Sequence, residues 1–316
     1  MAMIPAHWSA LWQPRGWTAA SATIVKFPQA LAFPDLPVRD LMGLPASLGR
    51  AGTLEVRLAT TRKEIKKAQR LRFKVFYGEG AAKADGRMAL TRRDICRYDR
   101  VCDHLVVIDH AARTRRLGRL KPKVVATCRL LRHDVAGAHF GFSSALEFDI
   151  APLLARHPGK RFLELGRSCV LAPYRSKKTL DLLWRGLWAY VRRHDIDAMI
   201  GCASFPGTNP LAHARALSFL ARHASAEAPW QVSALAARHV PMSNLGDAAI
   251  DARRALASLP PLIKGYLRAG ARFGDGAVVD RQFGTTDVFV VMPVADIEER
   301  YVAHFGAGES ADAKAA

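Results

Sequence analysis

The residues of this chain that could do chemistry gather in the segment 162–181, FLELGRSCVLAPYRSKKTLD. A short apolar run with the pattern of a strand carries two opposite charges, Glu164 and Arg167, and charges inside a strand are costly unless they are paired or functional. The run ends before Pro173, and three cations then precede an amphipathic helix: Arg175, Lys177 and Lys178. Helix N-termini favour phosphate, because free backbone N–H groups and the helix dipole both attract an anion. This segment therefore indicates a transferase whose donor arrives on a phosphate-bearing carrier.

Glu164 and Arg167 are three residues apart, so they would face opposite sides of a regular strand. A bulge between them would bring them to one face, and Gly166 is the residue at which a bulge is tolerated. A bulged central strand beside a βαβ crossover would also open the sheet into a cleft for an extended ligand. Because Arg129 on the neighbouring predicted strand adds a third charge, we predict a catalytic group of Glu164, Arg167 and Arg129. A structural ion pair is the alternative.

A second polar group lies at residues 92–104, RRDICRYDRVCDH. Its carboxylates, which include Asp99 and Asp103, stand next to a predicted strand and could hold a cationic substrate such as an amino acid with a basic side chain. The same residues are also common as N-caps and turn formers. His104 opens the strand, where a partly buried structural histidine is the more common finding.

The 316 residues carry a net charge of +19 with a pI near 10.3, which indicates an acidic partner: nucleic acid, an anionic membrane surface or an acidic protein. Fewer glycines and more cations than in nucleotide-binding loops suit a single phosphate on a pantetheine arm attached to an acidic protein. The five cysteines form no metal-ligand spacing, so we expect free thiols, no metal and a reducing compartment. No apolar run approaches the roughly 20 residues of a membrane span, and we expect a cytoplasmic protein.

The coarse pattern is that of a mixed α/β domain. We expect an irregular, flexible leader at residues 1–52, one domain at 53–305 and a disordered tail at 306–316. Within the domain, a strand and a helix capped by Thr60 or Thr61 precede a hairpin whose loop spans 111–123. A strand at 162–171, a helix at 180–194 and a strand at 198–204 then form a βαβ unit, and two strands close the chain. Antiparallel strands therefore precede a parallel βαβ unit.

Seven blocks taken in order carry a resemblance to a known family: RLRFKVFYGE (70–79), YDRVCDHLVVID (98–109), ATCRLLR (126–132), LELGRSCVLAPYR (163–175), IGCASFPGTNP (200–210), LPPLIKGYLRAGA (259–271) and DRQFGTTDVFVVMPV (280–294). Together they resemble the bacterial L-ornithine Nα-acyltransferases of ornithine-lipid synthesis, over roughly residues 54–305. This family is related to the GCN5-like N-acyltransferases (GNAT) and to acyl-homoserine-lactone synthases. The resemblance implies the GNAT fold, a mixed sheet with antiparallel front strands and a splayed parallel βαβ unit.

The resemblance also implies a reaction, the transfer of a 3-hydroxyacyl group from acyl carrier protein to the α-amino group of ornithine. Six residues match recurrent positions of the lactone synthases: Arg72, Phe76, Asp99, Arg129, Glu164 and Arg167. One position departs from the pattern, because Cys96 stands where both groups commonly have an acid, which puts the acceptor preference in doubt.

Residue roles follow from this reading. We expect Glu164 to take the proton of the amine, directly or through a water, and Asp99 or Asp103 to orient the ammonium of the acceptor. Arg72, Phe76 and His104 complete the expected acceptor site. Arg175, Lys177 and Lys178 would bind the phosphopantetheine of the carrier, with no other cofactor. An amphiphilic product makes peripheral contact with the anionic inner face of the cytoplasmic membrane a further expectation.

Two other readings stay open. A lactone synthase, or an acyltransferase for another amine, is the alternative among transferases, although the blocks at 259–271 and 280–294 argue against the lactone synthase. A nucleic-acid-binding protein is the alternative from another class, suggested by charge alone. The chain lacks the aromatic-interleaved basic strands of such proteins, so no nucleic-acid partner is expected.

Overall fold

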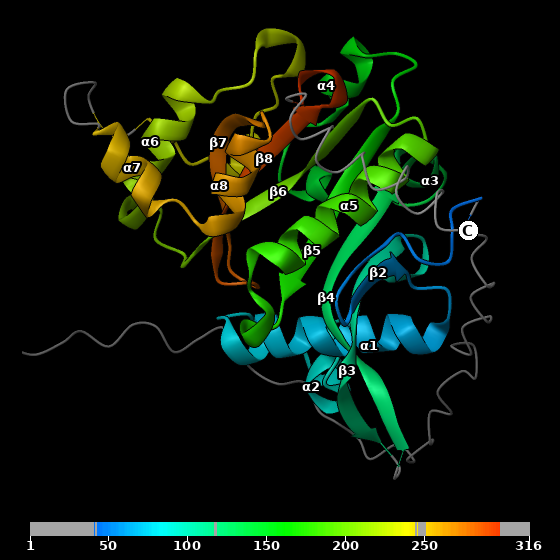
Figure 1. Ribbon diagram of the computed structural model, residues 1–316. Helices are drawn as coiled ribbons and strands as arrows, with labels where there is room; N and C mark the ends of the chain where they lie inside the picture. The colour runs from blue at the N-terminus through cyan, green and yellow to red at the C-terminus, as the bar shows by residue number, and fades with distance from the viewer. Residues whose placement is uncertain (1–40, 42, 117–118, 244, 246–250, 298–316) are drawn as a thin grey trace, which may run out of the picture. The chain divides into compact units, whose positions relative to one another are not determined.

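A computed structural model describes residues 41, 43–116, 119–243, 245 and 251–297, with backbone alone over 113–120. Its centre is an eight-stranded sheet in the order β1-β2-β3-β4-β5-β6-β8-β7 (Figure 1). The strands are β1 (Gly49–Ala51), β2 (Leu54–Leu58), β3 (Asp103–Arg116), β4 (Arg119–Arg132), β5 (Phe162–Val170), β6 (Ala198–Pro206), β7 (Arg272–Asp280) and β8 (Thr285–Pro293). Among these strands β5 and β6 are the parallel pair, and the other neighbours are antiparallel.

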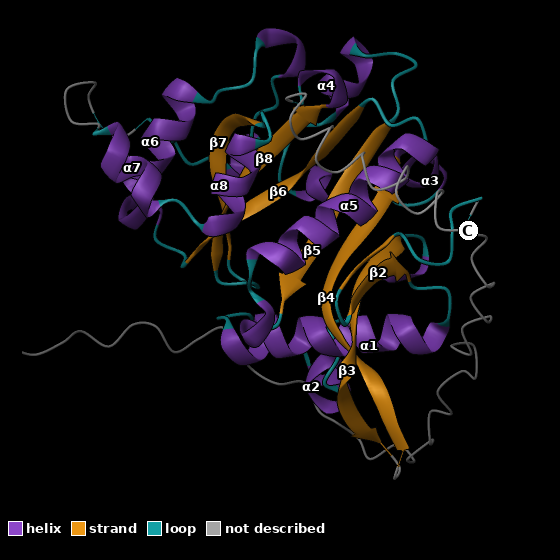
Figure 2. Cartoon of the chain, viewed as in Figure 1, coloured by secondary structure: helices purple, strands orange, loops and turns teal. Residues whose placement is uncertain are grey.

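Helices lie on both faces of this sheet (Figure 2). The α-helices are α1 (Arg62–Phe73), α2 (Gly86–Thr91), α3 (His133–Ala138), α4 (Ala151–Arg156), α5 (Lys177–Arg193), α6 (Ala214–His223), α7 (Ala252–Ser258) and α8 (Pro261–Arg268). The shorter turns are the π-helix η1 (Lys74–Glu79) and the 3₁₀ segments η2 (Arg97–Arg100), η3 (Ser143–Leu146), η4 (Ala172–Tyr174), η5 (Pro210–His213), η6 (Ala228–Trp230), η7 (Ala236–Arg238) and η9 (Val294–Asp296). Among the described residues, no helix is both long enough and apolar enough to cross a bilayer.

Helix α5 covers β1 to β4 on one face of the sheet, and in Figure 1 it lies across the strands. The close approach depends on Gly186, because a Cβ there would lie 2.6 Å from Cγ2 of Val56 and 3.1 Å from Cδ1 of Leu105. Helix α1 packs against β4, β3 and β5. Its start is fixed by a capping box in which the Thr61 side chain and Glu64 satisfy each other's backbone N–H groups. The predicted cap of this helix is confirmed.

The sheet splits between β5 and β6. The two strands pair from Phe162 with Ala198 to Leu165 with Gly201, and each then continues for five more residues over which the two no longer pair. On the other side of β5, the register with β4 shifts between Thr127 and Arg129, so β5 carries one extra residue. The predicted splayed βαβ unit, β5–α5–β6, is therefore confirmed.

The bulge itself differs from the prediction. Gly166 pairs regularly with Arg129, and the extra residue falls just after it. Arg167 takes φ +52, a left-handed conformation that is uncommon outside glycine. The prediction placed the bulge at the glycine for steric reasons, but in the structure an arginine adopts the unusual backbone, which re-aims its side chain.

Three other expectations need correction. The hairpin loop predicted at 111–123 is wrong, because β3 and β4 continue as paired strands to Arg116 and Arg119. Strand β1 falls inside the predicted leader and pairs with β2, so the sheet begins before residue 53. Helix α5 begins at Lys177 rather than at 180, which moves Lys177 and Lys178 into its first turn. Residues 1–40, 42 and the predicted tail at 306–316 lie outside the described residues.

Candidate active site

The face of the sheet that α1 covers holds a buried network of charges centred on Arg72. Its guanidinium is fully buried, with Nε 2.7 Å from Oδ2 of Asp94 and Nη2 2.7 Å from Oδ1 of Asp99. Burial disfavours the charged form of Arg72 and would lower its pKa, but the carboxylates of Asp99 and Asp94 outweigh burial and raise the pKa. Arg72 is thus a cation held between two anions, and Asp94 is a member of the network that we had not assigned to the predicted site.

Asp99 is the most completely satisfied carboxylate of this network. Besides Arg72, its Oδ2 accepts from Nε2 of Gln69 at 3.0 Å and from the backbone N–H of Cys96 at 3.1 Å. Burial alone would raise the pKa of Asp99, but Arg72, His104 and Arg129 outweigh it and lower the pKa to about 2. Such a carboxylate stays ionised at any working pH.

His104 and Arg129 flank Asp99. Nε2 of His104 lies 3.1 Å from the backbone oxygen of Asp99, and burial lowers the pKa of His104 to about 4, so the ring is neutral near pH 7. Nη1 of Arg129 is 3.9 Å from Oδ1 of Asp99 and donates to Sγ of Cys96 at 2.8 Å. Cys96 therefore contacts Arg129 at the position where the resemblance has an acid.

Phe76 and Arg167 are brought together by an aromatic residue that the sequence reasoning missed, Phe283. Cζ of Arg167 lies 4.1 Å from the centroid of the Phe283 ring, and the Phe76 ring meets that ring edge-on at 5.7 Å. Nε of Arg167 is also 3.5 Å from Oδ2 of Asp94. Phe76 sits on the π-helix η1, a feature that often occurs at functional sites. Phe283 comes from the turn between β7 and β8, and nothing local in its sequence distinguishes it.

Glu164 takes a different set of partners from Arg167. Its carboxylate accepts from the backbone N–H groups of Ser143 at 2.8 Å and Ser144 at 2.7 Å, and from both serine hydroxyls. These residues open η3, so buried Glu164 fixes this turn against β5. Nη2 of Arg129 reaches Oγ of Ser143 at 3.4 Å, which connects Glu164 to the network.

Asp103 lies apart from these residues. It pairs with Leu130 in β4, and its Oδ2 accepts from Oη of Tyr190 on α5 at 2.6 Å and lies 3.5 Å from Nη1 of Arg132. Because α5 covers the opposite face of the sheet from Glu164 and Asp99, the structure does not bring Asp103 to the other predicted acceptor residues. Neighbouring strand positions alternate between faces, and this separates Asp103 from His104.

The three predicted carrier-binding cations gather where β5 leads into α5. Nη2 of Arg175 is 2.5 Å from Oε2 of Glu79, and Nζ of Lys177 is 2.8 Å from Oδ2 of Asp181 one turn later. The Lys177 side chain is 82% exposed. Ser176 is the N-cap of α5 and accepts from the backbone N–H of Thr179. The expected geometry, cations around a helix N-terminus beside the split, is present.

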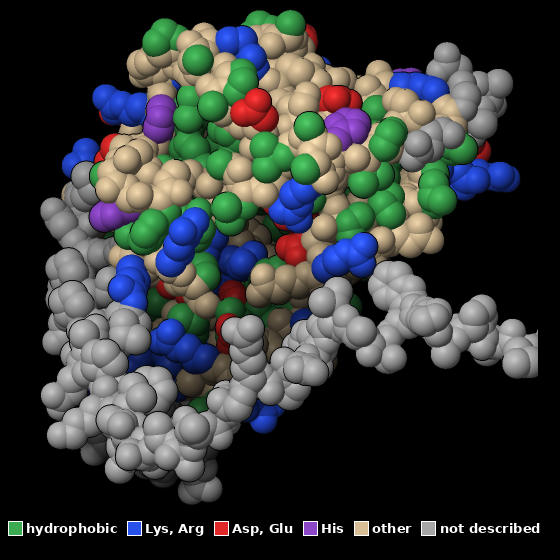
Figure 3. Space-filling model, turned by 180° about the vertical axis from the view of Figure 1, so that it is seen from behind, with side chains coloured by type: hydrophobic (Ala, Val, Ile, Leu, Met, Phe, Trp, Pro, Cys, Tyr) green, Lys and Arg blue, Asp and Glu red, His purple; other side chains and the backbone are tan. Residues whose placement is uncertain are grey.

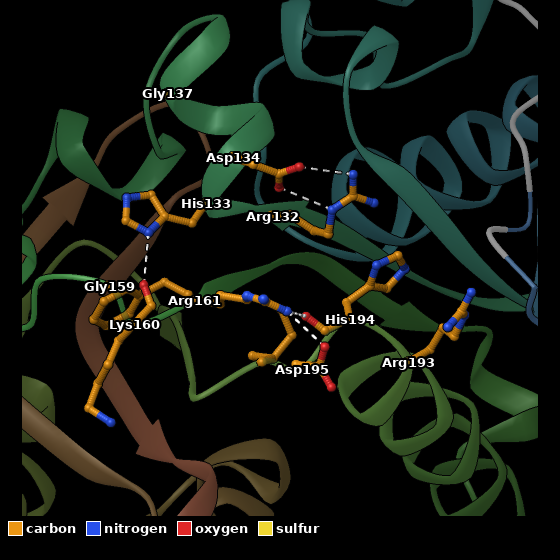
Figure 4. Close-up of a pocket in the computed structure, with 12 residues that line it drawn as sticks. Arg132, His133, Asp134, Gly137, Gly159, Lys160, Arg161, Arg193, His194 and Asp195 are labelled. Carbon is orange, nitrogen blue, oxygen red and sulfur yellow. Dashed lines mark hydrogen bonds and ion pairs between the residues drawn. The ribbon is translucent and has the colours of Figure 1, made fainter.

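A large pocket lies at the other end of β5 and contains none of the predicted site residues. Figure 4 shows Arg132 directed at Asp134 and Arg161 directed at Asp195, each within ion-pair distance. His133 meets the backbone oxygen of Lys160. Because these charged side chains pair with one another, the size of this pocket does not make it a reaction site.

The surface is hollowed on the side seen in Figure 3, the reverse of the view that shows α5 in front, and both acidic and basic side chains lie in the hollow. An acidic group that the sequence reasoning missed stands on the same face of the sheet as Glu164. It consists of Glu147, which follows η3, Asp280 at the end of β7 and Asp287 in β8. Scattered over 140 residues, these acids gave no local signal in the sequence.

Comparison with known proteins agrees with this geometry. The family described as "Acetyltransferase (GNAT) domain" matches residues 71–185, a range that contains every predicted site residue. An L-ornithine N(alpha)-acyltransferase of Agrobacterium fabrum is 52% identical over 258 residues, covering 82% of this chain and 87% of its own. Its counterpart in Rhizobium meliloti is 50% identical over 272 residues, covering 85% and 90%. This chain belongs to that acyltransferase family.

The family assignment holds beyond these two relatives. The L-ornithine N(alpha)-acyltransferase of Rhodobacter capsulatus is 39% identical and covers 78% of this chain and 92% of its own. Among solved structures, an N-acyl amino acid synthase from uncultured soil microbes gives a TM-score of 0.44 at 10% identity, covering 77% of this chain and 92% of its own. The predicted fold class, an α/β sheet of the GNAT kind, and the predicted enzyme class are confirmed.

Proposed function

We propose that this acyltransferase moves a 3-hydroxyacyl group from acyl carrier protein to the α-amino group of L-ornithine, giving lyso-ornithine lipid. The observation that carries the proposal is its identity of 50% and more, over most of the chain, with proteins named L-ornithine N(alpha)-acyltransferase. The split between β5 and β6, bordered by arginines and carboxylates, supports it as a place where an extended donor meets a charged acceptor.

The donor would enter through the split sheet. Where β5 and β6 stop pairing, a pantetheine arm can lie between them as an additional strand does. Its phosphate would reach the N-terminus of α5, where Arg175, Lys177 and Lys178 stand. Apolar residues gather at the split, as contact with an acyl chain would require: Leu165, Met199, Tyr266, Val290 and Met292. The net charge of +19 would speed encounter with an acidic carrier protein.

The reaction needs a neutral amine next to the thioester carbonyl. We propose that the α-ammonium of ornithine loses one proton to Glu164, relayed by the hydroxyl of Ser143 or Ser144 that donates to it. The amine nitrogen then bonds to the thioester carbon, and the C–S bond breaks as the tetrahedral intermediate collapses. The departing thiolate takes up the second proton of the nitrogen. Arg129 and Arg167 lie where they can stabilise the negative charge of this intermediate.

Two further parts of the proposal are the absence of a separate cofactor and contact with a membrane. The pantetheine arm belongs to the carrier, so no separate cofactor is needed. An amphiphilic product released by a cationic protein also suits contact with an anionic membrane surface on the cytoplasmic side.

One assay tests the proposal. The purified full-length protein is given 3-hydroxyacyl carrier protein or 3-hydroxyacyl-CoA with ornithine, lysine or S-adenosylmethionine, and the products are identified by mass. We expect an N-acylated ornithine, formed fastest from the carrier protein. Formation of a homoserine lactone, or acylation of lysine in preference to ornithine, would overturn the assignment of the acceptor. A preference for the CoA thioester would overturn the assignment of the donor.

A further inference from the structure

The acidic group on the split face has the properties of a binding site for a small organic cation. Glu147, Asp280 and Asp287 each present a carboxylate oxygen within 4.8 Å of the other two. A primary ammonium donates three N–H bonds at about 2.8 Å, which would place three tetrahedrally arranged oxygens about 4.6 Å apart. The size of the group and the number of its acceptors therefore suit one ammonium ion.

Asp287 supplies a second, independent observation. Its side chain is 6% exposed, and its Oδ1 is buried with no hydrogen-bond partner among the described residues. A buried carboxylate oxygen without a donor is costly, so such an atom calls for an explanation. Burial raises the pKa of Asp287 to about 6, and burial with the neighbouring Asp287 charge raises the pKa of Glu147 to about 7. Burial is the largest cause of both shifts, and the neighbouring hydrogen-bond donors and cations offset it only in part.

The cations near the group leave room for a ligand. Nη2 of Arg238 lies 3.2 Å from Oε1 of Glu147 but also donates to the backbone oxygen of Val279. Arg167 is close enough to lower the pKa of Asp287, yet its guanidinium stacks on Phe283 and faces Asp94. One arginine thus pairs with one of the three carboxylates.

The position of the group connects it to the reaction. Asp287 pairs with Ser204 in β6, three residues beyond Gly201, where the pairing of β6 with β5 ends. Glu147 follows directly after η3, the turn that Glu164 fixes. Burial raises the pKa of the half-buried thiol of Cys202, and the charges of Glu147, Asp287 and Glu164 all act on this thiol and raise its pKa further. A ligand bound to the acids would therefore lie beside Glu164 at the mouth of the split.

We propose that Glu147, Asp280 and Asp287 bind the side-chain ammonium of the acceptor and so select an amino acid with a basic side chain. This rests on the proposed function, since it supposes that the acceptor is a diamino acid. The site would hold the distal nitrogen as a cation, which cannot attack, and would leave the α-amine near Glu164. It would therefore determine both which amino acid is used and which of its two amines reacts.

The test uses Asp287→Asn and two acceptors, ornithine and norvaline, which has the same carbon chain without the side-chain amine. In the full-length wild-type enzyme we expect a much higher kcat/KM for ornithine. Losing one charge of a buried pair costs enough to raise KM for ornithine at least tenfold, with little change in kcat and in kcat/KM for norvaline. Glu147→Gln should act in the same direction. Retained norvaline acylation shows that a variant is folded.

The outcomes separate this inference from the proposed function. A wild-type enzyme that acylates neither amino acid would contradict the proposed function. A wild-type enzyme that prefers ornithine, with the same preference in Asp287→Asn and Glu147→Gln, would overturn the ammonium site alone. Loss of wild-type activity in EDTA, restored by a divalent cation, would overturn it in favour of a metal. Asp195→Asn, an exposed carboxylate at the other end of β5, is the matched control and should leave the preference unchanged.

Discussion

Two groups of buried charge lie on the same side of the sheet and behave in opposite ways. In the Arg72 network, each carboxylate has an arginine within hydrogen-bond distance, and the pKa of Asp99 falls to about 2. In the acidic group, three carboxylates share one directly paired arginine, Arg238, and the pKa of Asp287 rises to about 6. Asp287 is nearly as buried as Asp99, so the difference between these two carboxylates is due to their partners. In the first group every carboxylate has a cation beside it, whereas in the second only Glu147 has a directly paired cation among the described residues.

The two groups therefore have different roles, one structural and one in binding. A closed network of buried ion pairs holds α1, the segment with Asp94 and η2 in a fixed arrangement, and losing one member leaves an uncompensated charge. An open group binds a charge that arrives from solution. Glu164 stands between them, because the serines that it holds lead to Arg129 on one side and to Glu147 on the other.

The largest effect is expected at this junction. Glu164→Gln should lower kcat by a factor of about 10² to 10⁴, the usual contribution of a general base, while leaving KM for the carrier nearly unchanged. Steady-state kinetics with 3-hydroxyacyl carrier protein measure both values, and denaturant melts show whether η3 still holds. Glu227→Gln, an exposed glutamate at the start of η6, is the control. Wild-type turnover in Glu164→Gln would reduce Glu164 to a structural anchor.

Breaking the Arg72 network should lower the free energy of unfolding more than removing a surface ion pair does. Arg72→Met leaves Asp94 and Asp99 buried without their main cation, and we expect the free energy of unfolding to fall by about 3–5 kcal/mol. Denaturant unfolding followed by circular dichroism measures this change. Lys177→Ala removes an exposed ion pair and should change stability by less than about 0.5 kcal/mol. A similar loss in both variants would remove the distinction between buried network and surface charge.

Much of this arrangement is predictable from the sequence. Glu164, Arg167 and Arg129 are charges in apolar strands. Glu164 and Arg167 lie on β5, which borders the split that the βαβ pattern predicts, and Arg129 lies on the neighbouring strand β4. The pattern does not give their partners. Glu164 meets the serine turn, whereas Arg167 meets Phe283 and Asp94, and these partners come from distant parts of the chain.

The acidic group shows a second limit of sequence reasoning. Its members come from a loop and two distant strands, so only the register of β6, β8 and β7 brings them together. Asp103 is the opposite case. It is close to Asp99 in the sequence, but it lies on the face of the sheet that α5 covers, away from Asp99.

The contributions of Asp287 and Asp99 to the free energy of unfolding should depend on pH in opposite directions. The pKa of Asp287 rises from 3.8 to about 6 on folding, so its ionisation destabilises the folded state increasingly as pH rises through that range. Relative to wild type, Asp287→Asn should therefore gain on the order of 1–3 kcal/mol between about pH 4.5 and about pH 7.5. The pKa of Asp99 falls from 3.8 to about 2 on folding, so the stability that it contributes is lost as pH falls from about 3.8 to about 2.

The same series of melts provides the control. Over the pH interval used for Asp287→Asn, the difference between Asp99→Asn and wild type should stay constant, because Asp99 is ionised throughout in both folded and unfolded chains. Urea unfolding at several pH values gives both differences. A flat difference for Asp287→Asn would mean that the carboxylate already has its partners, and the open character of the group would be lost.

The smallest effect is expected at the surface, where Lys177 and Lys178 stand in the first turn of α5. Replacing both Lys177 and Lys178 by alanine should raise KM for the carrier about three- to tenfold at low salt and leave kcat unchanged. The effect should shrink as salt rises, because exposed charges are screened over about 8 Å at 0.15 M ionic strength. Lys160→Ala with Arg161→Ala removes the same charge from the paired end of β5. If the two double variants raise KM equally, the carrier responds to net charge alone, and the turn before α5 has no particular part in binding it.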